Sequence, residues 1–138
     1  MASRSFYPLE GTLTPGLVIL SGEFTTTTSG TIGTSDTEGF TVTKTGSEVG
    51  RYTVQLGRSS SLVDKYPKIR GVLTTVIGPD DAAMTDAKGL TCVVRDDDVA
   101  SDGTFEVQFC DQDSGADAEL QDGAKVLLVF FLKNRTFG

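Results

Sequence analysis

The sequence predicts an all-β fold, an antiparallel β-sandwich, and three observations support this. Short runs rich in Val, Ile, Thr, Phe and Tyr are separated by clusters of Gly, Asp and Ser, which is the pattern of strands and turns. Several runs alternate apolar and polar residues, as half-buried strands do, and no segment shows a convincing helical period. A chain of 138 residues suits one domain. We expect a single β-sandwich over residues 16–138 and an extended N-terminal arm over residues 1–15.

The clearest hairpin is predicted from residues 40–43 and 51–56, both of which alternate. The connection between them contains Gly46 and Gly50, and glycine readily adopts the positive φ that a hairpin turn needs. We therefore expect two adjacent antiparallel strands, with Tyr52 on the buried face.

A second pair of strands is predicted further along the chain. Residues 104–109 alternate in the same way, which directs Glu106 and Gln108 outward. Residues 90–95 form the expected partner strand, and the acidic run 96–98 is expected to end it.

Two further strands are predicted upstream of this pair. Residues 16–27 give a first strand with a Thr-rich end, and residues 71–77 give a strand that ends at Gly78 and Pro79. Residues 25–38 are rich in Thr, Ser and Gly and offer little to bury, so we expect a loop at the edge of the fold.

The last predicted strand, residues 125–133, is apolar on both faces. In a two-layer sandwich only one face of a strand meets the core, so the other must meet a loop, the N-terminal arm or another subunit. We favour contact with another subunit; coverage by a long connection of the same chain is the alternative. The expected interface comprises Phe6, Tyr7 and Leu9 of the arm, Leu128, Phe130 and Leu132 of the strand, and Lys133 and Arg135 at its end.

The composition argues against an enzyme. The sequence contains no histidine, which removes the usual general base and the commonest transition-metal ligand. It also contains no Walker loop, GxSxG elbow, GxGxxG turn or CxxC pair. We expect no catalytic residue and no cofactor.

The acidic clusters contain the candidate metal ligands, and these candidates are weak. The segment that begins at Asp111 starts like a calcium loop, but its glycine falls at the fifth position and its twelfth residue is Asp122 instead of Glu. Asp113, together with Asp96 and Asp98, could complete an irregular calcium site at one end of the sandwich. Solvated acidic loops that aid solubility are the preferred interpretation.

The two cysteines, Cys92 and Cys110, lie in predicted strands with apolar neighbours. We expect two buried free thiols. A cross-strand disulfide is the alternative, provided that the strands pair in register and the compartment is oxidising.

Charge and hydropathy exclude two kinds of partner. The net charge of −7 and pI near 4.4 repel phosphate backbones, so we expect no nucleic-acid binding. The longest apolar run, residues 126–132, is far shorter than a membrane-spanning helix.

Residues 1–8 lack the apolar region of a signal peptide, so synthesis in a cytoplasm without secretion is expected.

Several segments resemble small structural proteins of tailed bacteriophages. They are residues 4–11 (RSFYPLEG), 39–46 (GFTVTKTG) and 50–54 (GRYTV), with the closing apolar strand that ends in Lys133-Asn134-Arg135. Residues 39–40, the GxYxV pattern of 50–54, and LxxGxxV over residues 120–126 also resemble the jelly-roll of C1q/TNF-like domains.

The resemblance implies a jelly-roll-like sandwich that forms a symmetric homo-oligomer, commonly a trimer, with the last strand near the subunit interface; a dimer remains possible. It implies a capsid decoration (cement) protein on the outer surface of the virion head, with the major capsid protein as partner. A tail or fibre module is the alternative, and a calcium- or carbohydrate-dependent recognition module is a third. The preferred interpretation of the basic cluster Arg58, Lys65, Lys68 and Arg70 is a solvated loop. The alternative is that this cluster, with Lys133 and Arg135, docks on an acidic capsid surface.

Overall fold

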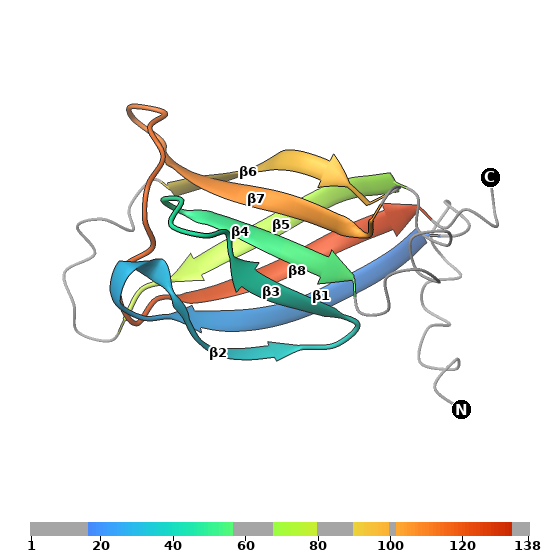
Figure 1. Cartoon of the computed structure of the whole chain (residues 1–138), viewed down its shortest axis with the longest axis horizontal. Coiled ribbons are helices and arrows are strands. Elements are labelled where there is room, and N and C mark those ends of the chain that lie inside the picture. The colour runs from blue at the N-terminus through green and yellow to red at the C-terminus, as the bar shows by residue number, and fades with distance from the viewer. Residues whose placement is uncertain (1–16, 57–67, 80–89, 100–101, 134–138) are drawn as a thin grey trace.

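The computed structural model describes residues 17–56, 68–79, 90–99 and 102–133. These residues form two four-stranded antiparallel sheets that pack face to face (Figure 1). The strands are β1 (Leu17–Thr26), β2 (Ile32–Thr37), β3 (Phe40–Lys44), β4 (Arg51–Leu56), β5 (Lys68–Ile77), β6 (Leu90–Asp98), β7 (Thr104–Asp111) and β8 (Lys125–Lys133). The predicted all-β antiparallel sandwich is confirmed.

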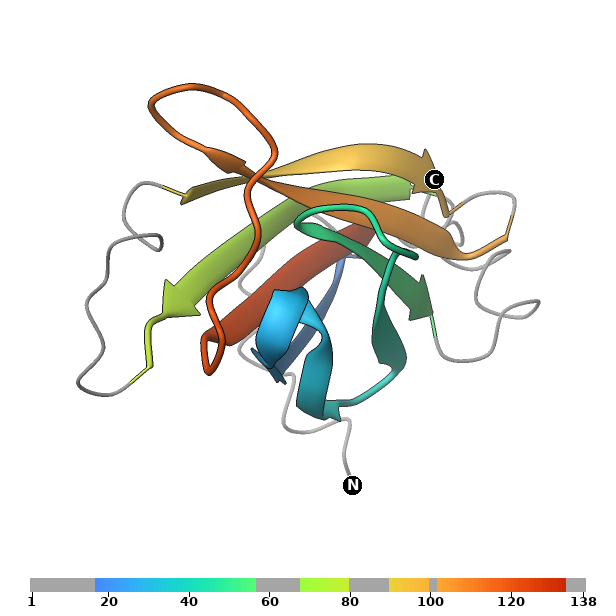
Figure 2. The same cartoon turned by 60° about the vertical axis from the view of Figure 1, so that its left-hand side comes forward.

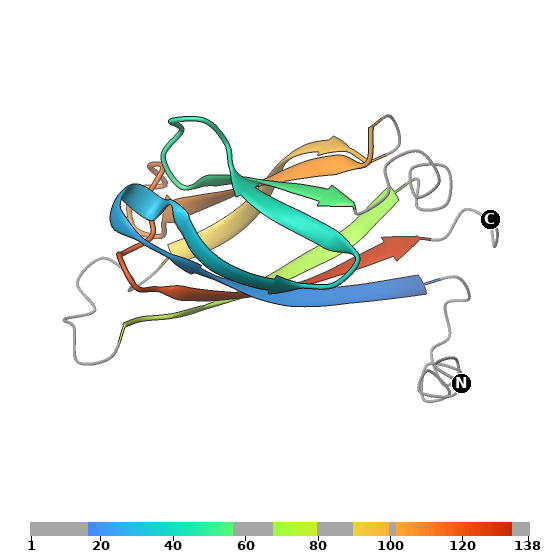
Figure 3. The ribbon, with the colours of Figure 1, turned by 60° about the horizontal axis from the view of Figure 1, so that its bottom comes forward.

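The strand order is β2-β1-β8-β5 in one sheet, here called sheet 1, and β3-β4-β7-β6 in the other, sheet 2. The two layers are separate in Figure 3, with sheet 1 below sheet 2. The chain passes between the sheets after β2, β4, β5 and β7, and the first and last strands pair at the centre of sheet 1. Connections that cross between the two sheets are typical of jelly-roll-like sandwiches.

The predicted hairpin of β3 and β4 is confirmed. The two strands pair in register from Phe40 opposite Leu56 to Lys44 opposite Tyr52. Gly46 and Gly50 in the connection have φ of 53° and 64°, the left-handed region that glycine adopts without steric cost.

Aromatic side chains from both sheets fill the core. The Phe130 ring lies edge-on to Phe40 and Phe105, with centroids 4.8 and 5.1 Å away. Tyr52 contacts Phe24 and Phe109 at 5.1 and 5.9 Å. Such ring pairs stabilise a core by about 0.5–1.5 kcal/mol each beyond the area they bury, so the two aromatic clusters tie sheet 1 to sheet 2.

The prediction that Gln108 points to solvent was wrong, because its side chain is only 1% exposed. The turn before β4 covers it. The Gln108 amide donates hydrogen bonds to the carbonyl oxygens of Val49 and Phe109, at 2.7 and 3.0 Å, and its carbonyl accepts one from Arg51 at 3.2 Å. Burial of this polar group is tolerated because its hydrogen-bonding atoms have partners.

The loop predicted over residues 25–38 instead contains strand β2, which pairs with β1. A short 3-10 turn, Thr28–Gly30, joins the two strands and is visible at the end of the sandwich in Figure 2. From Gly33 to Asp36 the strand is exposed, so it lacks the apolar alternation by which a strand is recognised in a sequence. In the described parts of the chain, no helix is long and apolar enough to span a membrane.

The acidic run 96–98 does not end β6, as was expected, but continues it to Asp98. The register shifts between Val94 and Asp96, after which the strand stays paired with β7. β6 is one of the two edge strands of sheet 2, and its acidic side chains are exposed. Charged residues are compatible with an edge strand because they remain in water.

Candidate protein-docking face

The outward surface of sheet 1 is apolar over much of its area. Alternation along β8 directs Leu127, Val129 and Phe131 away from the core, and the register places Leu73 of β5 opposite Val129 and Ile19 of β1 opposite Phe131. We call this surface the outer apolar face; it comprises Ile19, Leu73, Ile77, Leu127, Val129 and Phe131. Leu73 is 61% exposed, and Ile77 and Ile19 are 46% and 36% exposed.

Sheet 2 presents a different outward surface. The side chains that alternate with its core positions are mainly threonine and other polar residues, with Val93 as an apolar member; the polar ones include Thr41, Thr43, Thr53, Gln55, Thr104 and Glu106. An antiparallel sheet commonly keeps one face in water. The outer face of sheet 2 has the composition of a solvated surface, whereas the outer apolar face has the composition of a surface that is covered.

The structure separates the two alternating sets of residues on β8. Leu128, Phe130 and Leu132, which the sequence assigned to an interface, are at most 1% exposed and belong to the core. That assignment is corrected, because successive side chains of a strand point to opposite faces and these three point toward sheet 2. The outward members of the strand are Leu127, Val129 and Phe131 instead.

The other predicted interface residues are not placed. Phe6, Tyr7 and Leu9 of the expected arm, and Arg135, lie outside the described residues. Only the backbone of Lys133 is described, and it pairs with Leu17 and Lys68.

An open depression of about 510 Å³ lies on the outward side of sheet 1. It crosses β2, β1 and β8, and its lining combines apolar side chains of β8 with carboxylates of β1, β2 and the β2–β3 connection. The lining residues are Ser21, Gly22, Glu23, Asp36, Glu38, Leu127, Leu128 and Val129. The depression therefore joins the outer apolar face to an acidic border.

The weak metal candidates do not come together. Leu90 at the start of β6 pairs with Asp111, and Asp98 at its end pairs with Thr104. Since the strands are antiparallel, Asp96 and Asp98 lie at one end of the ladder while Asp111 and Asp113 lie at the other. No group of three or more potential ligands that could hold a metal occurs among the described residues. The register of β6 and β7 therefore does not bring the four weak candidates together into one calcium site.

The Asp111 side chain organises its own turn. Its Oδ1 accepts hydrogen bonds from the backbone N–H groups of Asp113 and Ser114, at 2.7 and 3.1 Å. This is the local pattern in which an aspartate side chain shapes a turn.

The two cysteines are free and half-buried. Cys92 is opposite Phe109, which is a core residue, whereas Cys110 is opposite Thr91 on the outward side of sheet 2. The two thiols therefore point to opposite faces of the sheet, and this register excludes the alternative of a cross-strand disulfide.

We expect Cys92 to react slowly with alkylating agents. Burial raises the pKa of its thiol to about 11, and only the thiolate attacks iodoacetamide. In a Cys110→Ser variant at pH 8, alkylation followed by mass spectrometry should be about 100-fold slower than in the same variant unfolded in denaturant. The rate should climb steadily between pH 8 and 10, because the thiolate fraction is still rising there. Equal rates in folded and unfolded chains would contradict the buried orientation of Cys92.

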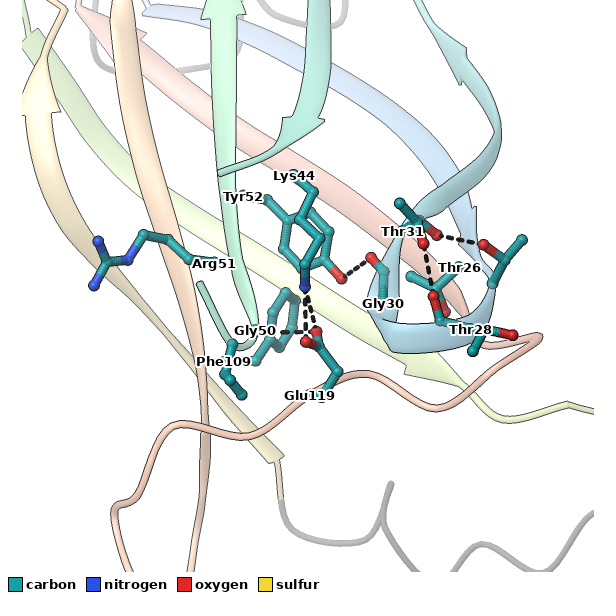
Figure 4. Close-up of polar contacts among 12 residues, drawn as sticks. Thr26, Thr28, Gly30, Thr31, Lys44, Gly50, Arg51, Tyr52, Phe109 and Glu119 are labelled. Carbon is teal, nitrogen blue, oxygen red and sulfur yellow. Dashed lines mark hydrogen bonds and ion pairs between the residues drawn. The ribbon is translucent and has the colours of Figure 1, made fainter. Parts of the chain in front are cut away.

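A polar cluster at one end of the sandwich was not anticipated from the sequence (Figure 4). Both carboxylate oxygens of Glu119 accept hydrogen bonds from Lys44 at 2.7 Å, and Oε1 also accepts one from the Gly50 N–H at 3.1 Å. The Tyr52 hydroxyl donates to the Gly30 carbonyl at 2.6 Å. Burial, together with the Glu119 charge, raises the pKa of Tyr52, which keeps the hydroxyl a donor.

This cluster, the Lys44–Glu119 clasp, connects three parts of the chain. Glu119 lies in the long connection between β7 and β8, which projects from the sandwich before crossing its end (Figure 2). Gly50 belongs to the β3–β4 turn and Gly30 to the β1–β2 connection. The residues are far apart in sequence, so no local sequence motif predicts the cluster. The hydrogen bonds to Glu119 join the β7–β8 connection to the end of β3 and the β3–β4 turn, and the hydrogen bond from Tyr52 joins β4 to the β1–β2 connection.

Comparisons with protein-family models, with curated proteins and with solved structures each gave no match to this chain.

Proposed function

We propose that this chain is a non-enzymatic virion structural protein, a capsid decoration protein that binds the outer surface of a tailed-phage head and stabilises contacts between major capsid protein subunits. The observation that carries the proposal is the outer apolar face of sheet 1, set against the polar outer face of sheet 2. A sandwich with this asymmetry is suited to lie between a protein surface and water. The phage setting is supported by the sequence resemblance.

The energetics of this face suit a protein that binds in many copies. Full burial of a large aliphatic side chain contributes about 1.5–3 kcal/mol. The side chains of the outer apolar face are already partly buried in the isolated chain, so docking would bury only the remaining area of each. Each side chain therefore adds a modest increment. Anything that binds the assembled shell more tightly than its separated subunits stabilises it by mass action, and repeated modest contacts add up over a symmetric shell.

The test compares two exposed apolar residues on opposite sheets. Leu73 is 61% exposed on the outer apolar face, and Val93 is 49% exposed on the outward side of sheet 2. Purified heads that lack the protein are mixed with wild type, Leu73→Asp or Val93→Asp and separated on a density gradient. We expect wild type and Val93→Asp to sediment with heads and Leu73→Asp to bind at least about 30-fold more weakly, because docking would bury its carboxylate.

Both variants should unfold within a few degrees of wild type, since each replaces an exposed side chain. Wild type that remains at the top of the gradient would count against the proposal, as would Leu73→Asp binding as tightly as wild type. The number of copies per virion separates the alternatives: hundreds would support the head, and a few dozen or fewer would support a tail or fibre.

A further inference from the structure

We infer that the protein surface that covers the outer apolar face carries basic side chains, arginine or lysine, next to apolar ones. The inference rests on the proposed function for the presence of a protein partner and adds the chemistry of that partner. It is carried by the acidic border of the face and by the depression that links the two.

The acidic border lies on β1, on β2 and in the short connection between β2 and β3. Glu23 is directly opposite Asp36 in the β1–β2 ladder, and Glu23 is opposite Leu127 in the β1–β8 ladder, so these three residues share the outward face. Glu38 follows Asp36 by two positions and, like it, is exposed and lines the depression. Three carboxylates thus border the apolar side chains.

Little positive charge balances this border. Lys125 lies 3.7 Å from Glu23. Among the described residues, no ion pair includes Asp36 or Glu38. An approaching basic group would therefore find two carboxylates that form no ion pair with any described residue, and charge complementarity of this kind sets partner choice.

The depression fits the two-part character of a basic side chain. Arginine and lysine have an aliphatic stem and a charged end, and the stem packs on apolar surface while the charge stays near water or a carboxylate. Leu127 and Val129 offer the apolar part of the lining, and Asp36 and Glu38 offer the charged part. A second copy of this chain would bring the same carboxylates and a net charge of −7 to the interface, which disfavours it as the occupant.

The experiment uses two short probe peptides with the same leucines, one with arginine at the alternate positions and the other with glutamate. Each is titrated into the full chain, with affinity measured by calorimetry and the contact surface mapped by amide chemical shifts. We expect the arginine peptide to bind about tenfold more tightly at low salt, with the preference falling as salt is added. Shifts should concentrate at Ser21, Glu38 and Val129.

A charge-reversed variant and a matched control test whether the preference for the arginine peptide depends on the acidic border. Asp36→Lys with Glu38→Lys should abolish the arginine preference. Asp113→Lys with Asp117→Lys makes the same change of charge in the exposed β7–β8 connection and should preserve it. Both variants should keep the wild-type circular dichroism spectrum and melting temperature.

Three outcomes would overturn the inference: equal affinity for the two peptides, shifts that map to another surface, or a free protein whose face is already covered by a second copy or by residues 1–16, as seen from its mass or from nuclear Overhauser contacts. The head-binding assay separates the two ideas. If wild type binds heads but does not distinguish the peptides, the inference is wrong and the proposed function stands. If wild type prefers the arginine peptide but does not bind heads, the proposed function is wrong and the basic preference of the face stands.

Discussion

Replacing Phe130 with aspartate is expected to prevent folding, and replacing it with alanine is expected to lower the free energy of unfolding by about 3–5 kcal/mol. The Phe130 ring is fully buried and lies between Phe40 of β3 and Phe105 of β7. A carboxylate at this position would be buried without a partner, and a cavity would remove the ring contacts between the sheets. A domain of this size has only about 5–15 kcal/mol of stability to lose. Urea denaturation followed by circular dichroism measures the change.

Phe131 is the matched control. It is the same residue type, one position along β8, but it is only half-buried and lies on the outward side of sheet 1. Phe131→Ala should therefore cost no more than about 1.5 kcal/mol. If Phe130→Ala and Phe131→Ala were equally destabilising, the assignment of the two β8 faces would be incorrect.

Replacing Gly50 with alanine is expected to lower the free energy of unfolding by about 3 kcal/mol or more, for two reasons. Its φ of 64° lies in the left-handed region, and a Cβ built there would overlap the carbonyl oxygen of Ala118. Relief of that overlap would move the β7–β8 connection away and break the hydrogen bond from Gly50 to Glu119. Thermal and urea denaturation of the variant would measure the loss.

Gly46 provides the comparison for Gly50. It belongs to the same connection and also has a positive φ, of 53°, but a Cβ there would meet nothing within 4 Å. Gly46→Ala should cost about 1 kcal/mol, the cost of the backbone conformation alone. A loss as large as that of Gly50→Ala would show that backbone conformation, and not the close approach of Ala118, accounts for both.

The sequence predicted best where local pattern and burial agree. The alternation of residues 40–43, 51–56 and 104–109, with glycines at the turn, gave β3, β4 and β7 because each has one face in the core and one toward water. β2 was missed because an exposed edge strand shows no such alternation. Gln108 was misplaced because the turn that covers it comes from elsewhere in the chain.

The docking face could be predicted only in part. That β8 has two apolar faces is evident from its sequence, but which set of side chains enters the core depends on the register with β1 and β5. A shift of one residue exchanges the two faces. The acidic border was not foreseen because Glu23, Asp36 and Glu38 gather only when β2 pairs with β1. Likewise, the Lys44–Glu119 clasp joins residues 75 positions apart.

The position of β8 between β1 and β5 also constrains how the molecule reaches its folded state. Among the described strands, β5 pairs only with β8, and β1 pairs only with β2 and β8, so most of sheet 1 cannot form before β8 is available. Pairings between distant parts of a chain form slowly, because a large loop must close first. During synthesis, the apolar residues of β1 and β5 would leave the ribosome well before their common partner, which makes the nascent chain a candidate for chaperone binding.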